Sequence, residues 1–333
     1  MEPLLEIDGL TVSTREASPK RLLDGISLRV CPGEVLAVVG ESGSGKSLTA
    51  LSIMQMLPAA LSMQAERMTL DGDDLLSLRR KEIDGLHGGR IGMLFQQPRR
   101  MLDPTATVGS QVAEPLVKHL RMSHRDARRR VLELLADVGI DEPARRAQAY
   151  PHQLSGGLAQ RVMIAIALAA SPPLLIADEP TTALDVTVEA QILHLLKQKK
   201  HALGMSMLFI SHDLNVVASI ADRIAVMYAG RVVESGTADE ILTQPEHPYT
   251  RALIECASLQ PDASGQLYVI PGGSDTARDL DRGCRFRPRC GLTQEAHLEQ
   301  KCDSNEPVLL SLGRTPAEHE CRCWGTAEHQ EGA

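Results

Sequence analysis

Gly40-Glu41-Ser42-Gly43-Ser44-Gly45-Lys46-Ser47 is the stretch of this 333-residue chain that decides its fold. The run before it, Glu34 to Val39, is apolar after its first residue, as expected for a strand buried on both faces of a parallel sheet. A helix predicted from Lys46 to Leu57 follows. A glycine-rich turn between such a strand and helix turns backbone N–H groups toward an anion. The spacing therefore predicts a phosphate loop for Mg-ATP, with Lys46 on the outer phosphates and Ser47 on Mg²⁺.

Downstream, an apolar strand ends in two carboxylates at Leu174-Leu175-Ile176-Ala177-Asp178-Glu179. Carboxyl ends of parallel strands share one edge of a sheet, so both carboxylates are expected beside the phosphate loop. Asp178 is predicted to bind Mg²⁺ directly or through water. Glu179 is predicted to polarise the attacking water as a general base. A helix-capping acidic pair is the alternative, which the upstream phosphate loop disfavours.

Strands and helices alternate around these two motifs, which predicts a doubly wound α/β core with one helical insertion. The insertion reaches to about Tyr150. Ala229-Gly230 is predicted to join the last two strands as a hairpin. The other expected elements are strands at Leu4 to Val12, Ile26 to Val30, Ile91 to Phe95, Ser206 to Ile210, Arg223 to Tyr228 and Arg231 to Glu234, and a helix at Val188 to Lys200.

Composition argues against a nucleic-acid partner and against a membrane span. The net charge is −8 and only 2% of residues are aromatic. The basic stretch Arg121 to Arg130 is interpreted as the solvated start of an amphipathic helix. The longest apolar stretch, Val162 to Ala170, is about half of the ~20 residues that cross a bilayer. Because the N-terminus lacks the pattern of a signal peptide, the chain is expected to stay in the cytoplasm.

Leu154-Ser155-Gly156-Gly157, placed before an apolar helix, resembles the signature of ATP-binding cassette (ABC) proteins. The resemblance implies a P-loop ABC nucleotide-binding domain: a RecA-like core with antiparallel edge strands and a helical subdomain at about 97–160. It also implies that Ser155, Gly156 and Gly157 contact the γ-phosphate held by a partner subunit. The remaining family motifs follow in order. They imply that Gln96 senses Mg²⁺ and the membrane subunit, that Asp185 crosses a dimer interface, and that His212 holds the γ-phosphate.

Three longer stretches resemble the ATPase subunits of dipeptide, oligopeptide and nickel importers. They are Pro151 to Gly157, Ala177 to Thr187, and Glu246-His247-Pro248-Tyr249-Thr250-Arg251-Ala252-Leu253. This resemblance implies an ATP-binding domain at 1–250 and a C-terminal extension at 251–333. It further implies ATP-driven uptake of di- or oligopeptides from the cytoplasmic face of the inner or plasma membrane. The implied partners are a second, different cassette chain, two transmembrane permease subunits, and a periplasmic or lipid-anchored substrate-binding protein.

Five of the seven cysteines fall between Cys284 and Cys323, which indicates a metal site in a reducing compartment. Spacing alone fits either tetrahedral Zn²⁺ or a [4Fe–4S] cluster, and free buried thiols are the alternative. The subfamily resemblance favours a [4Fe–4S] cluster. Its pattern of a histidine four residues before the last cysteine matches His319 and leaves Cys321 spare. The implied ligands are Cys284, Cys290, Cys302 and Cys323.

Two other functions stay open at this stage. A nickel or metallophore importer ATPase is one, because the cargo is read by other subunits. A soluble ABC ATPase that acts on ribosomes or DNA is the other, although such proteins usually carry two cassettes and this chain has a single Gly-Lys-Ser loop.

The sequence departs from the family pattern where adenine is usually contacted. The family usually has an aromatic residue near Val12 to Arg15, whereas Thr14 cannot stack on a base. Adenine affinity is therefore expected either to be weaker or to rest on Arg15.

Overall fold

The computed structural model describes residues 2–182, 184–261, 265–273, 282–313 and 319–326. These residues form two compact units, each made of segments that are distant in sequence. The first unit holds Met1–Leu4, Val30–Glu34 and Ser77–Ile210. The second holds Leu5–Arg29, Val35–Leu76 and Ser211–Ala333. The predicted boundary at residue 250 is a different division, and it stays a prediction.

Three parallel strands form the core of the first unit: β7 (Ile91–Leu94), β8 (Leu174–Asp178) and β9 (Ser206–Ile210). All their residues are buried, which explains why their sequences are nearly continuous apolar runs. Of the residues in β8, only Asp178 carries a charge, and it stands at the carboxyl end of the strand. The predicted parallel core is confirmed for these strands.

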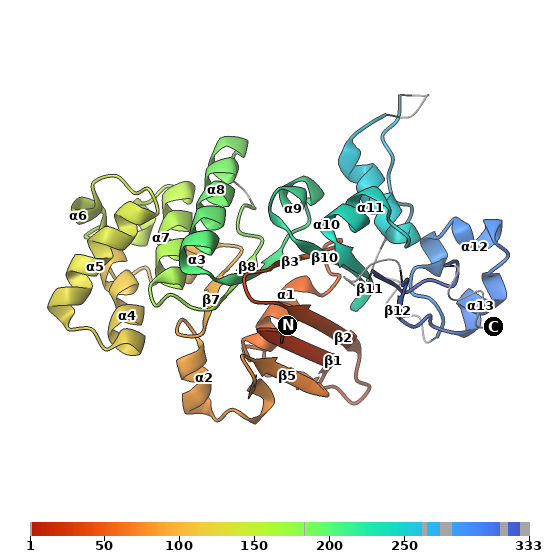
Figure 1. The fold of residues 1–333 in the computed structure, drawn as a ribbon, viewed down its shortest axis with the longest axis horizontal. Coiled ribbons are helices and arrows are strands. Elements are labelled where there is room, and N and C mark those ends of the chain that lie inside the picture. Colours follow the sequence, from red (N-terminus) through yellow and green to blue (C-terminus); the bar gives the residue numbers. More distant parts are fainter. Residues whose placement is uncertain (1, 183, 262–264, 274–281, 314–318, 327–333) are drawn as a thin grey trace. The chain divides into compact units, whose positions relative to one another are not determined.

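Helices make up the rest of the first unit. Of these, α4, α5 and α7 pack on one another, and Figure 1 shows them as neighbours. Ser123 caps α5 by accepting a hydrogen bond from the Asp126 N–H, so the basic stretch Arg121 to Arg130 does begin an amphipathic helix. The helices are α2 (Arg80–Leu86), α3 (Pro98–Met101), α4 (Val108–Leu120), α5 (His124–Asp137), α6 (Pro143–Arg146), η2 (Pro151–Gln153), α7 (Gly156–Leu168) and α8 (Val186–Leu203).

The second unit contains two sheets. In one, β3 (Val35–Val39) pairs parallel with β10 (Arg223–Tyr228), and β10 pairs antiparallel with β11 (Arg231–Thr237). The turn between β10 and β11 has φ of 46° at Ala229 and 82° at Gly230, as a tight two-residue hairpin requires, so the predicted hairpin is confirmed. Beyond β11 the order continues with β13 (Glu320–Cys321) and β12 (Leu310–Ser311).

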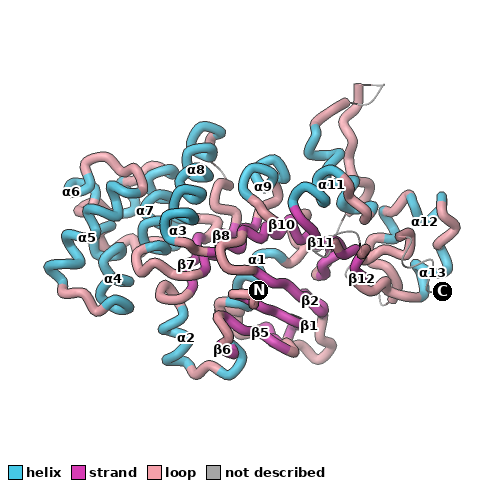
Figure 2. Tube along the Cα trace, in the orientation of Figure 1, coloured by secondary structure: helices cyan, strands magenta, loops and turns pink. Residues whose placement is uncertain are grey.

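The other sheet of this unit is antiparallel. Its order is β2 (Arg21–Val30), β1 (Leu5–Thr14), β5 (Arg67–Leu70) and β6 (Asp73–Asp74), while β4 (Leu61–Gln64) also pairs with β1. Figure 2 shows β1, β2 and β5 side by side. The helices of the second unit are α1 (Lys46–Ile53), α9 (Leu214–Ile220), α10 (Ala238–Thr243), α11 (Pro248–Ser258), η4 (Arg287–Arg289), α12 (Leu292–Glu295) and α13 (Glu299–Ser304); η1 (Leu75–Ser77) follows β6.

Candidate active site

The phosphate loop of the second unit lies between β3 and α1, as predicted, and its glycines are needed for different reasons. Gly40 has a φ of 149°, and a Cβ there would lie 2.1 Å from the carbonyl oxygen of Met227 on β10. Gly45 has a φ of 111°, and a Cβ there would lie 2.5 Å from a methyl group of Leu23. Only glycine fits both the backbone conformation and the space. The loop is therefore pressed against its neighbours at both positions.

Lys46 opens α1 and is only 5% exposed. Its ammonium group donates to two carbonyl oxygens of the loop, those of Gly40 at 2.7 Å and Glu41 at 3.0 Å. A buried cation must be hydrogen-bonded, and here the loop itself supplies acceptors. The lysine thus closes the loop into a ring and holds a positive charge at the helix N-terminus, where an anion is favoured.

The loop has the chemistry to hold phosphate groups. Ser44 is 3% exposed, and its hydroxyl has no hydrogen-bond partner among the described residues. A buried hydroxyl without a partner is costly, and a phosphate oxygen would satisfy it. Together with the charge of Lys46 and the N-terminus of α1, this hydroxyl makes the loop fit a nucleotide polyphosphate.

In the first unit, Asp178 is the last residue of β8, and Glu179 follows it directly. Asp178 is 7% exposed. Glu179 has a φ of 47°, in the left-handed region that non-glycine residues seldom adopt, and its N–H donates to the carbonyl oxygen of Ile210 at 2.9 Å. Strain of this kind persists only where the surroundings enforce it and gathers at functional sites.

Gln96 meets Glu179 in the first unit, so the structure brings together two residues that the sequence named separately. The Gln96 amide donates to Oε2 of Glu179 at 2.8 Å. Thr182 donates its hydroxyl to the same oxygen at 2.9 Å. Thr182 lies in the motif that carries the subfamily resemblance, but no sequence pattern assigned it a role. These two donors fix the orientation of the carboxylate that was predicted as the general base.

The signature residues form the start of α7. Ser155 is its N-cap and accepts a hydrogen bond from the N–H of Leu158 at 3.3 Å. A Cβ on Gly157 would lie 3.1 Å from the side chain of Val188 on α8, so only a very small residue fits. Asp185 caps α8 by accepting from the N–H of Val188 at 2.9 Å. The two helix starts therefore meet at Val188, and their predicted roles toward a partner subunit stay predictions.

His212 and Arg15 lie in the second unit. His212 is exposed, directly after Ile210-Ser211, where the chain leaves β9. Arg15 donates through Nε to the carbonyl oxygen of Leu61 at 2.7 Å, which ties the end of β1 to the start of β4. This contact gives Arg15 a structural role as well as the predicted one toward adenine. The predicted role of His212 toward the γ-phosphate stays a prediction.

The predicted cysteine cluster is wrong. Within the residues that the structure describes, no three His, Cys, Asp or Glu side chains form a group that could hold a metal ion, neither [4Fe–4S] nor Zn²⁺. Burial raises the pKa of the Cys323 thiol to about 11, and burial likewise raises those of Cys284 and Cys302. Burial thus disfavours the thiolate form, which is the form that ligates a metal.

The other residues of that prediction also have different partners. Cys321, expected to be the spare thiol, is fully buried and clusters with Cys323, Leu312 and Leu292. His319 is directed at the carboxylate of Glu234, with 2.8 Å between Nε2 and Oε1. All described cysteines are free thiols, and in the extension Cys302, Cys321 and Cys323 are buried while Cys284 and Cys290 are half-buried, in line with the alternative of free thiols.

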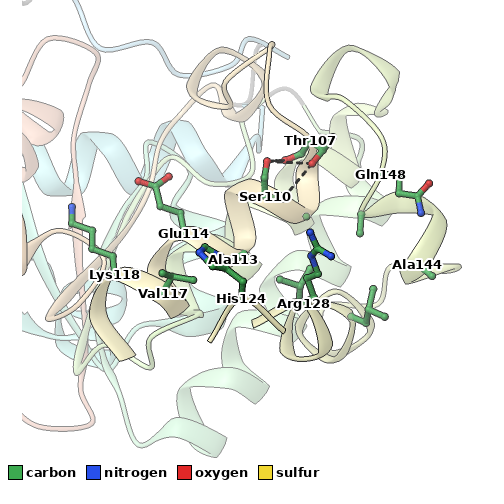
Figure 3. Close-up of a pocket in the computed structure, with 14 residues that line it drawn as sticks. Thr107, Ser110, Ala113, Glu114, Val117, Lys118, His124, Arg128, Ala144 and Gln148 are labelled. Carbon is green, nitrogen blue, oxygen red and sulfur yellow. Dashed lines mark hydrogen bonds between the residues drawn. The ribbon is translucent and has the colours of Figure 1, made fainter. Parts of the chain in front are cut away.

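A pocket of about 850 Å³ opens in the first unit between α4, α5 and α6 (Figure 3). Apolar side chains such as Val117 and Leu132 line it together with charged ones, including Glu114, Lys118 and Arg128. Leu132 is 37% exposed, although it is a large apolar side chain. A groove that mixes exposed apolar surface with both signs of charge is typical of a surface that another protein covers.

Comparison with known proteins agrees with this geometry. The family profile described as ABC transporter matches residues 23–182, and the profile described as oligopeptide/dipeptide transporter, C-terminal region, matches residues 233–296. The oligopeptide transport ATP-binding protein OppD of Bacillus subtilis is 43% identical over 96% of this chain and 88% of its own length. The chain belongs to the ABC transporter family. As a member of it, the chain is an ABC-type ATPase with a P-loop α/β domain.

Further relatives support the same assignment. The oligopeptide transport ATP-binding protein AppD of Bacillus subtilis is 43% identical over 95% of this chain and 96% of its own length. Among solved structures, the ATP-binding cassette MJ0796 in a dimeric post-hydrolysis state with ADP and Pi matches with a TM-score of 0.63. It is 31% identical and covers 70% of this chain and 98% of that one. In the described part of the ABC chain, no helix combines the length and apolar character of a membrane span.

Proposed function

We propose that the chain is the ATP-hydrolysing subunit of an ABC importer for di- or oligopeptides. The observation that carries the proposal is the match of residues 233–296 to the C-terminal region of oligopeptide and dipeptide transporters, on a chain 43% identical to OppD of Bacillus subtilis. The same observation favours peptides over nickel or metallophores as cargo. It also favours membrane transport over a soluble role on ribosomes or DNA.

In the proposed reaction the chain binds Mg-ATP at the phosphate loop. Lys46 and the N-terminus of α1 attract the phosphates, while the buried hydroxyl of Ser44 gains an acceptor. Ser47 and Asp178 are the oxygen ligands proposed for Mg²⁺, which neutralises charge on the phosphate oxygens when bound. Glu179, oriented by Gln96 and Thr182, accepts the proton of the attacking water.

A second cassette is proposed to complete the site. Ser155, Gly156 and Gly157 at the start of α7 would face the γ-phosphate bound by that partner, with Asp185 at the shared interface. His212 would contact the γ-phosphate bound by its own chain. Closure of two cassettes on two ATP molecules would then move the membrane subunits, which act with a substrate-binding protein. The proposed location is the cytoplasmic face of the membrane, as a peripheral subunit.

The catalytic part of the proposal is tested by Glu179→Gln. This variant keeps the shape of the side chain but removes the base, so ATP turnover should fall by roughly 100-fold or more. ATP binding, measured by titration with a fluorescent nucleotide, should survive. Glu133→Gln, an exposed carboxylate on α5 paired with Arg130, is the matched control. Unchanged turnover in Glu179→Gln would refute the assignment of the base.

The transport part is tested in a reconstituted complex with the membrane subunits and a second cassette. ATP turnover is measured with binding protein loaded with dipeptide, with oligopeptide or with a nickel chelate. Stimulation by a peptide supports the proposal, and stimulation by the nickel chelate alone overturns the peptide assignment. Absence of stimulation by all three would point to a different cargo or to the soluble role.

We further propose that the groove between α4, α5 and α6 receives a helix of a permease subunit. Its exposed apolar side chains and its mixed rim charges fit a short amphipathic helix. Leu132→Arg should leave basal ATP turnover unchanged, because none of the residues assigned to ATP binding or hydrolysis lies on α5. Stimulation of turnover by loaded binding protein should be lost. Full stimulation in that variant would exclude this groove as the contact. Leu203→Arg, on the exposed end of α8, is the control.

A further inference from the structure

Glu41 places a carboxylate in the phosphate loop, and an arginine of the C-terminal extension, Arg289, binds this carboxylate. Arg289 donates from Nη1 to Oε2 of Glu41 at 2.7 Å and from Nη2 to Oε1 at 2.9 Å. The Arg289 side chain is 5% exposed and that of Glu41 is 27% exposed, so the pair is partly buried. Two parallel bonds between guanidinium and carboxylate fix both position and orientation. The extension thus holds the second residue of the loop by its side chain.

Arg289 is itself held in place before any nucleotide arrives. Its Nε donates to the carbonyl oxygen of Pro271 at 2.7 Å, and Nη1 also reaches the hydroxyl of Tyr228 at 3.4 Å. The guanidinium lies 5.7 Å from the ring centre of Tyr228 and 5.9 Å from that of Phe286. Stacking on aromatic faces and a full set of acceptors suit arginine and not lysine. The contact to Glu41 is therefore preorganised.

Tyr249 holds the backbone of the same residue. The N–H of Glu41 donates to the Tyr249 hydroxyl at 2.8 Å, and Tyr249 is fully buried. Its ring packs against Tyr228, with 4.6 Å between ring centres, and against Phe286 at 5.4 Å. Since the carbonyl oxygen of Glu41 already accepts from Lys46, both backbone polar groups of Glu41 are engaged. The loop is anchored at this residue from three directions.

The negative charge of Glu41 determines how these contacts affect ATP binding. The triphosphate of ATP carries several negative charges, and a carboxylate in the loop that binds it would repel it by roughly 1–2 kcal/mol at a separation of about 10 Å. We propose that Arg289 and Tyr249 are positioning residues for ATP: Arg289 neutralises and holds the Glu41 carboxylate, and Tyr249 fixes the Glu41 backbone. The C-terminal extension thereby sets the ATP affinity of the phosphate loop. This inference rests on ATP binding by the chain and not on its cargo.

Arg289→Met in the full chain tests the inference. ATP turnover as a function of ATP concentration should show KM about tenfold higher, while kcat changes less than about twofold, because the lost charge affects binding and leaves Glu179 untouched. Adding Glu41→Gln to that variant should restore most of the affinity, since no uncompensated carboxylate remains. Arg287→Met is the matched control: Arg287 pairs with Asp303 inside the extension, and its KM should stay at the unmodified value.

The outcomes separate this inference from the proposed function. No ATP binding by the unmodified chain would refute the proposed function itself. An unchanged KM in Arg289→Met, or a double variant that binds ATP as weakly as the single one, would overturn the inference. If Arg289→Met fails to fold by circular dichroism, Glu41→Gln alone decides: it should bind ATP more tightly than the unmodified chain, and equal or weaker binding would count against the charge argument.

Discussion

Thr182 contributes a single hydroxyl to the site, and that hydroxyl donates to the same oxygen of Glu179 as the Gln96 amide does. The backbone of Glu179 is already in the left-handed region, so the carboxylate is aimed by its own strained turn and by two donors. A general base works only when its oxygen is within reach of the proton that it abstracts. Positioning of the base is therefore shared between two short segments, one that follows β7 and one that follows β8.

Thr182→Val removes the hydroxyl while it preserves the branched shape. We expect kcat for ATP hydrolysis to fall roughly tenfold, because a hydrogen bond to a charged group is worth about 1.5–3 kcal/mol and only part of it acts in the transition state. Steady-state turnover at saturating ATP measures this. Thr105→Val is the control, since the Thr105 hydroxyl is exposed and bonds only to Asp103 nearby. Equal kcat in both variants would remove Thr182 from the site.

At the scale of single residues, the sequence predicted the phosphate loop and the Glu179 base but missed their supports. Tyr249 and Arg289 touch Glu41 from positions more than 200 residues away, with separations of 208 and 248. No local period or motif spacing encodes such a contact. The cysteine prediction failed for a related reason: the spacing of the cysteines fits a metal site, but only the fold decides how their thiols are arranged and buried.

Among the elements, β11 is joined to the segment just before β13 by a buried pair, Glu234 and His319. Glu234 on β11 is fully buried and accepts from the N–H groups of Glu246 at 2.7 Å and His247 at 3.0 Å, besides its contact with His319 at 2.8 Å. The hydrogen bond to Glu234 raises the pKa of His319 above its ordinary 6.5. Although burial acts to raise it, the pKa of Glu234 lies below its ordinary value because His319 and other donors bond to it.

This pair makes stability depend on pH. A histidine whose folded pKa is raised contributes stability that is complete below 6.5 and is lost as pH rises through its folded value. We therefore expect the free energy of unfolding to fall as pH rises above 6.5, and His319→Gln to flatten that slope. Urea unfolding across this range measures it, with the exposed His194→Gln as control. An unchanged slope in His319→Gln would contradict the prediction.

The effect of His319 is measured above pH 6.5 because another histidine, His247, changes the free energy of unfolding in the opposite direction below that pH. Burial lowers the pKa of His247 to about 4, so this residue is neutral when folded and must gain a proton on unfolding in acid. Its contribution to stability is therefore lost as pH falls from 6.5 toward 4. Stability should be greatest near the ordinary pKa of histidine, where neither loss has begun.

The strands differ in how well the sequence predicts them. β3, β8 and β9 are buried on both faces, and their apolar runs identified them almost to the residue. The sequence missed β4, β5, β6, β12 and β13, since each has only two to four residues and no alternation can be read over that length. Their existence depends on partners elsewhere in the chain, as β4 depends on β1 and β13 on β11.

On the scale of the whole chain, the C-terminal extension is integrated into the second unit. Arg285 forms an ion pair with Asp24, which also pairs with Arg231 at 2.7 Å. Arg289 holds Glu41, and β13 continues the sheet beyond β11. Arg322 is half-buried and donates from Nε to the carbonyl oxygen of Val232 on β11 at 2.9 Å. An appendage that folds by itself would share none of these contacts.

A chain that ends at Leu259 tests this integration. Glu41 would lose Arg289, Asp24 would lose Arg285 while it keeps Arg231, and the outer edge of β11 would become exposed. We expect the free energy of unfolding of the remaining chain to drop by about 3 kcal/mol or more, because breaking a partly buried pair leaves an uncompensated charge. Chemical denaturation followed by circular dichroism measures the loss. An unchanged midpoint would mean that the extension is a separate domain after all.

The spacing of Arg285 and Arg289 within one short turn has a consequence for how such proteins can be recombined. Each arginine matches an acid that lies more than 240 residues earlier, Asp24 or Glu41, with separations of 261 and 248. An extension transplanted onto a cassette without these acids would bury two cations with nothing to balance them. Loop and extension should therefore be inherited, exchanged and engineered as one unit, and chimaeras that cut between them should fail unless both acids are carried along.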